Sequence, residues 1–154
     1  MKVRAIVLML MLCVVGVVVS FAADNPNMGT WKLNEAKSKF APGSPMNTMV
    51  VYEAAGDMVK VTTDGTSSGA PIHTEWTGKF DGKAYPVTGD SSVDTRAYKK
   101  VNDRTLDLTN KKGDKVTTTG RIVVSADGKS RTVTTTRTDS DGKKSTSTAV
   151  YDKQ

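Results

Sequence analysis

Hydrophobic and polar residues alternate in short segments along most of this chain. From residue 29 onward, these segments are rich in β-branched residues and are separated by Gly-Asp or Asp-Gly pairs such as Gly56-Asp57, Asp64-Gly65 and Asp127-Gly128. Glycine and aspartate tolerate positive φ, so such pairs close hairpins at low steric cost. The pattern predicts an antiparallel meander, and the 21 threonines suit its pleated, half-exposed surface.

Ten strands are predicted between these turn signals. They span residues 29–33, 48–55, 58–63, 72–80, 83–87, 93–101, 105–110, 115–125, 130–138 and 144–152. Short hairpins pair each strand with its neighbour in sequence, which favours an all-β, up-and-down barrel of about 8–10 strands, with a β-sandwich as the alternative. Residues 34–40 are the one helical candidate, and the prolines that follow end it within two turns.

The alternation also assigns side chains to the two faces of the sheet. Val116, Thr118, Gly120, Ile122 and Val124 share one face, and Gly120 indicates a bend or bulge of the kind that barrel closure needs. The last three predicted strands are poor in large hydrophobic residues, so their inner face consists mainly of Thr, Ser and Ala. Such an interior is either a solvated cavity or a small, weakly packed core, and the sequence leaves both open.

The first 22 residues have the pattern of a secretory signal peptide. Lys2 and Arg4 precede an apolar run over residues 5–19, and Ser20-Phe21-Ala22 supplies the small residues of a cleavage site. Because a bilayer span needs about 20 apolar residues, we expect cleavage after Ala22 and no permanent anchor. The predicted organisation is a signal peptide (1–22), a short tail (23–28) and one barrel domain (29–154), exported to the periplasm or secreted.

Composition narrows the possible partners and chemistry. The chain has 22 basic and 16 acidic residues, a net charge of +6 that includes Lys2 and Arg4 of the predicted leader. The charges are interspersed, and Lys111-Lys112 and Lys143-Lys144 lie beside turn signals, so we expect no nucleic-acid partner. The single cysteine, Cys13, lies in the predicted leader, which leaves the domain without disulfides or a thiol nucleophile. We expect a monomer without cofactor or metal.

The two ends of the chain carry a family resemblance. Gly29-Thr30-Trp31-Lys32-Leu33 resembles the Gly-x-Trp opening of the lipocalins and the first strand of the fatty-acid-binding proteins, whose closing strand resembles residues 150–153. Residues 76–90 are similar to a segment of small, exported, bacterial lipocalin-like proteins. The resemblance implies a closed calycin barrel in which Trp31 plugs one end. Ala149 stands where the fatty-acid-binding proteins place a ligand-binding arginine, and residues 34–47 are too few for their helical lid.

Five residues are candidates for contact with a ligand inside such a barrel. Inward aromatic residues can line a pocket or fill a core, and two arginines alternate in phase with inward residues. An inward guanidinium would need an anionic partner from a ligand or from the protein, but the expected position of both arginines is the outer face. The candidates are Trp76, Arg96, Tyr98, Arg137 and Tyr151.

No catalytic or metal-binding motif stands out. His73, the only histidine, lies two residues from Glu75 on the same predicted face, and no Gly-x-Ser-x-Gly pattern accompanies it. Residues 139–142 match the start of a calcium loop, yet Val150 occupies the position of the bidentate Glu. The expected roles are a surface-strand histidine and an Asp-Gly hairpin turn.

Three functions are compatible with these patterns. The favoured hypothesis is an exported, non-enzymatic protein that binds a small apolar or amphipathic ligand inside the barrel, because the meander, Trp31 and the thinly apolar interior agree with it. The alternative is a structural or interaction module without an enclosed ligand, which acts through its Thr-rich outer face or an edge strand. A hydrolase or isomerase that uses His73 ranks below both.

Overall fold

The computed structural model describes residues 25–154, which form ten strands. These are β1 (Gly29–Leu33), β2 (Met46–Ala55), β3 (Met58–Ser67), β4 (Ala70–Gly78), β5 (Tyr85–Thr88), β6 (Thr95–Asn102), β7 (Thr105–Lys112), β8 (Lys115–Val124), β9 (Ser130–Thr138) and β10 (Lys144–Lys153). The helical candidate at residues 34–40 shrinks to one 3₁₀ turn, η1 (Glu35–Lys37). The predicted signal peptide lies outside the described residues, among which no helix has the length and apolarity to cross a bilayer.

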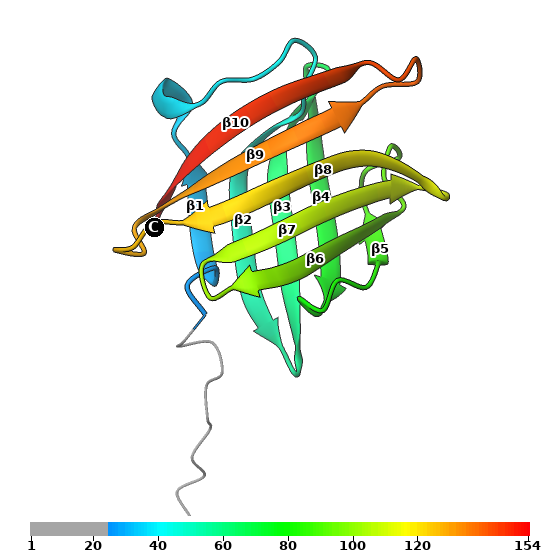
Figure 1. Cartoon of the computed structure of the whole chain (residues 1–154). Helices are drawn as coiled ribbons and strands as arrows, with labels where there is room; N and C mark the ends of the chain where they lie inside the picture. Colours follow the sequence, from blue (N-terminus) through cyan, green and yellow to red (C-terminus); the bar gives the residue numbers. More distant parts are fainter. Residues whose placement is uncertain (1–24) are drawn as a thin grey trace, which may run out of the picture.

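Antiparallel pairing closes the ten strands into a ring. Each strand pairs with its neighbour in sequence, and β1 pairs with β10 as well as with β2, so that Trp31 lies between Lys153 and Val50. Figure 1 shows β6–β10 crossing in front of β1–β4. The topology confirms the up-and-down barrel over the β-sandwich. The strand pairing is shortest at β5, which pairs with each neighbour through only two residue pairs.

Most of the predicted turns are confirmed, and one is wrong. The pair Asp64-Gly65 does not end a strand, because β3 continues to Ser67 and its hairpin turns at Ser68-Gly69. A Cβ at Gly65 would collide with the carbonyl oxygen of Met46, next to a register shift in the pairing of β2 with β3. Gly65 therefore permits the close approach of two strands. The glycines with positive φ that lie between strands, as predicted, are Gly56, Gly82, Gly89, Gly113, Gly128 and Gly142.

The inner face of β8 follows the predicted alternation except at the beginning of the strand. Ile122 and Val124 are buried in the barrel and Thr118 lines its interior. Val116 is instead 40% exposed, because the register between β7 and β8 shifts after Asn110. Of the bend or bulge expected at Gly120, the bulge is absent, because the pairing register there is regular with both neighbouring strands. A Cβ at Gly120 would lie 2.8 Å from the carbonyl oxygen of Thr134. Glycine is therefore favoured at this position because β8 and β9 lie too close together for a side chain.

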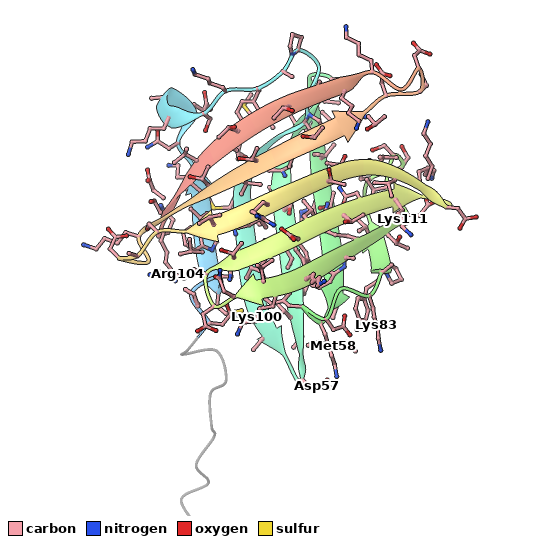
Figure 2. The ribbon with its side chains drawn as sticks, viewed as in Figure 1. Asp57, Met58, Lys83, Lys100, Arg104 and Lys111 are labelled. Carbon is pink, nitrogen blue, oxygen red and sulfur yellow. The ribbon has the colours of Figure 1, made fainter. Side chains whose placement is uncertain are left out.

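The strand connections define two ends of the barrel. Figure 2 shows Asp57, Met58 and Lys83 near one another at one end and Lys111 toward the other. Large side chains fill the first end, which we call the closed end, and the turns after β3, β5, β7 and β9 surround the second, which we call the mouth. The fully buried side chains of the core include Trp31, Val61, Trp76, Leu106, Val124 and Arg131.

We predict that Gly89→Ala destabilises the protein far more than Gly142→Ala. Both glycines have positive φ, but a Cβ at Gly89 would collide with the carbonyl oxygen of His73, whereas the space at Gly142 is open. The Gly142 variant should lose about 1 kcal/mol from backbone strain alone. The Gly89 variant should lose about 3 kcal/mol or more, because β4 must move. Chemical denaturation of both variants measures the difference, and equal losses would contradict the packing of β4 against this turn.

Candidate functional site

The mouth opens into a cavity of about 930 Å³ inside the barrel. Eight of the ten strands line it, all except β1 and β5, together with residues 42–45 and the turns at the mouth. Ligand sites have volumes of about 300–1,000 Å³, so the space suffices for a small organic molecule. The interior therefore contains a cavity that opens at the mouth, which answers the question that the composition of β8–β10 leaves open.

The inward side chains of β6–β10 form four rows along the ladder, because residues paired across antiparallel strands lie side by side. The rows are named in order from the mouth to the closed end. The outermost row consists of Arg96, Asn110, Thr118, Arg137 and Ser145. The second row consists of Tyr98, Leu108, Gly120, Thr135 and Ser147. The third row consists of Leu106, Ile122, Val133 and Ala149, and the innermost of Val124, Arg131 and Tyr151.

Two arginines of the outermost row line the cavity. Nε of Arg96 donates to Oδ1 of Asn110 at 2.8 Å, and Nη1 donates to the hydroxyl of Tyr98 at 3.4 Å. These partners are neutral, so they orient the guanidinium without balancing its charge. None of the ion pairs among residues 25–154 includes Arg96 or Arg137. The outermost row therefore carries two positive charges that no carboxylate neutralises.

A third arginine lies at the closed end of the cavity. Arg131 is only 2% exposed, and its guanidinium carbon lies 4.8 Å from the ring centroid of Trp31 and 4.9 Å from those of Tyr52 and Tyr151. Its Nε and Nη1 have no hydrogen-bond partner among the described residues. Three aromatic faces thus compensate for a buried positive charge in place of a carboxylate. Trp31 is held in turn by its Nε1, which donates to the carbonyl of Asn27 at 2.8 Å.

The tyrosines around Arg131 remain protonated at neutral pH. Burial raises the pKa of Tyr151 to about 12, and the Arg131 charge opposes the rise. Burial raises the pKa of Tyr52 further, with a contribution from the neighbouring Tyr98. The hydroxyl of Tyr151 donates to the carbonyl of Asn47 at 3.0 Å, which joins β10 to β2. No phenolate therefore forms to neutralise the guanidinium at neutral pH.

The lining of the cavity has an excess of positive charge. Its basic residues are Arg96, Lys112, Lys115, Arg131, Arg137 and Lys143, and its acidic residues are Asp90 and Asp139. Both acids lie in turns at the mouth and bind their own backbone: Asp90 accepts from Ser92, and Asp139 accepts from the amides of residues 141 and 143. Inside the mouth, guanidinium groups are the only charged groups of the lining.

The five predicted ligand contacts occupy two kinds of position. Arg96, Tyr98, Arg137 and Tyr151 line the cavity. The expected outward position of the two arginines is wrong, because strand register puts them on the same face as Tyr98 and Val133. Trp76 belongs to the core: it is 2% exposed, its Nε1 donates to the carbonyl of Arg96 at 2.9 Å, and its ring centroid lies 4.8 Å from that of Tyr98.

Arg131 is the residue that the sequence interpretation missed. It alternates in phase with Val133 and Arg137 along β9, so the period-two pattern that places those residues inside could have placed Arg131 there too. Its aromatic partners come from β1, β2 and β10, and only the closed ring brings these strands together.

His73 lies on the outer face of β4. Its Nδ1 lies 2.6 Å from Oδ1 of Asp64 and its Nε2 lies 3.9 Å from Oε1 of Glu75, and its side chain is 57% exposed. The hydrogen bond to Asp64 raises the pKa of His73. No group of His, Cys, Asp and Glu residues within 25–154 could hold a metal ion, and residues 139–142 form the β9–β10 turn. His73 is therefore a surface-strand residue whose side chain lies on the face opposite the cavity.

Comparison with known proteins adds no family assignment. No protein-family model matches the chain, and a search of the curated proteins finds no match. The closed ten-stranded antiparallel barrel is consistent with a calycin-like fold. The site must therefore be interpreted from its own chemistry.

We predict that Asp64→Asn lowers the pKa of His73 toward its ordinary value, because the carboxylate that stabilises the imidazolium is lost. Because the pKa of His73 is raised in the folded state, the pair stabilises the fold at pH values below the ordinary pKa of histidine. This stabilisation is lost as the pH rises through the raised pKa. Proton NMR titration of the single imidazole measures the change. Asp57→Asn, which removes the partner of Lys79 instead, should leave the histidine pKa in place. An unchanged titration in the Asp64 variant would contradict the pairing.

Proposed function

We propose that this protein is an exported, non-enzymatic binding protein that holds a small amphipathic molecule inside its barrel. The observation that carries the proposal is the cavity of about 930 Å³, which joins a polar outer row to an apolar interior. Polar groups at one level and hydrophobic groups at the next suit a ligand with a polar end and an apolar body.

The chemistry of the lining supports binding over catalysis. The chain has one histidine, and it lies on the outer face. The two carboxylates of the lining are engaged in turns at the mouth. Most of the polar lining consists of serine, threonine, arginine and protonated tyrosine side chains. These side chains bind and orient charged or polar groups, and they are poor proton-transfer catalysts at neutral pH.

We predict that the purified protein binds a neutral hydrophobic fluorophore, Nile red, saturably, and that Val133→Trp weakens this binding by about tenfold or more, because the indole fills the cavity. Fluorescence titration measures the affinity.

The matched control is Thr134→Trp, which places the same side chain on the exposed face of the same strand. It should leave the affinity within about twofold of the original, since surface substitutions are usually small in effect. Absence of saturable binding, or equal weakening by both variants, would contradict an internal site and favour the interaction-module alternative.

Export forms the second part of the proposal and rests on the charged, apolar and small-residue segments at the start of the chain. We predict that protein recovered from the periplasm or the medium of a bacterial host begins at Ala23. Mass spectrometry of the intact protein identifies the first residue. Recovery only in the cytoplasm with residues 1–22 attached would contradict export.

A further inference from the structure

We propose that the ligand is an amphipathic anion, with its acidic headgroup held by Arg96 and Arg137 at the mouth and its apolar body directed toward the closed end. This inference rests on the proposed function and adds the charge and the orientation of the ligand. It is carried by the position of two unneutralised guanidinium groups in one row of the cavity wall.

The register places the two arginines in one row of paired residues on the wall. Arg96 lies opposite Asn110, Asn110 opposite Thr118, and Thr118 opposite Arg137. Three strand spacings of about 4.8 Å separate the two arginines along the wall, roughly 14 Å in all. Because the wall is curved and both side chains point inward, their long stems converge on the space between them. One headgroup can therefore contact both.

The other side chains of this row complete a site for an anion. Oδ1 of Asn110 accepts from Arg96, which leaves the amide N–H groups of Asn110 available as donors. Thr118 and Ser145 add hydroxyl groups, and both line the cavity. The row thus offers donors from five side chains and no carboxylate acceptor, which is the arrangement that an acidic headgroup requires.

Charge balance points to the same class of ligand. A neutral guest would displace water from Arg96 and Arg137 and leave two cations partly desolvated without a counter-ion, which is costly. An anionic headgroup removes this penalty and gains charge-assisted hydrogen bonds. Lys115 and Lys143 at the mouth are outside the ion pairs of the described residues, so they strengthen the field that attracts an anion to the opening.

The orientation follows from the rows below. Leu108, Ile122 and Val133 line the cavity between the outermost row and the closed end, and Val50 of β2 also lines it. Nε and Nη1 of Arg131 are enclosed, and three rings cover the guanidinium, so the deep arginine offers little access to a headgroup. The apolar body therefore points inward and the headgroup stays at the mouth.

Displacement of bound Nile red by decanol, decanoate and decyl phosphate at neutral pH tests this inference. The three competitors share a ten-carbon chain and differ in the headgroup. At least one of the two anions should displace the dye at roughly tenfold lower concentration than decanol, which corresponds to one charge-assisted contact pair.

Three variants identify the residues responsible. Arg96→Gln and Arg137→Gln should each remove most of the advantage of the anions and leave decanol unchanged. The matched control, Arg121→Gln, removes an arginine from the outer face of β8, where it pairs with Asp107 at 2.7 Å. It should preserve the preference for anions.

The outcomes separate the inference from the proposed function. Equal displacement by all three competitors, or an anion preference that survives in the double variant Arg96→Gln/Arg137→Gln, overturns the inference while binding of Nile red still supports an internal site. If Nile red does not bind and calorimetry detects neither decanol nor the anions, the proposed function fails and the inference fails with it.

Discussion

Closure of ten strands into one ring determines how much space the molecule encloses, and its inward side chains are too small to fill that space. The ring closes because β1 pairs with β10 on one side and with β2 on the other. Large aromatic side chains fill the closed end, whereas the inner faces of β8–β10 toward the mouth carry Thr118, Thr135, Ser145 and Ser147. The cavity is the volume that remains when a wide barrel is lined by short side chains on one half of its wall.

The cluster of Trp31, Tyr52, Tyr151 and Arg131 stabilises the closed end from strands at opposite ends of the chain. Burial of a guanidinium without a carboxylate is costly, and here aromatic faces offset part of that cost. Tyr52, Tyr151 and Arg131 of this cluster also line the cavity. Beyond Arg131, the hydrophobic residues of the third row give way row by row to arginine, asparagine and hydroxyl side chains toward the mouth.

The sequence predicts the strands well because its turn signals are local. Asp-Gly and Gly-Asp pairs mark most hairpins, and the predicted strand 130–138 matches β9 at both ends. Asp64-Gly65 is wrongly predicted as a turn because its glycine is needed for the close approach of β2, which local sequence does not reveal. Alternation within a strand correctly groups Arg96 with Tyr98, but it does not tell which face is inside. Arginine side chains are mostly exposed in proteins, which favours the outer face. In this barrel Arg96 and Arg137 instead line the cavity.

Whether the cavity inside the barrel is open to solvent is best measured by cysteine accessibility in a chain whose Cys13 is replaced by Ser. Three variants compare the cavity with its surroundings: Thr135→Cys in the lining, Thr134→Cys on the exposed face, and Val61→Cys in the core. A small, water-soluble thiol reagent should modify the Thr135 variant under native conditions, more slowly than the Thr134 variant and much faster than the Val61 variant. A Thr135 variant as protected as the Val61 variant would show a filled interior and contradict the account.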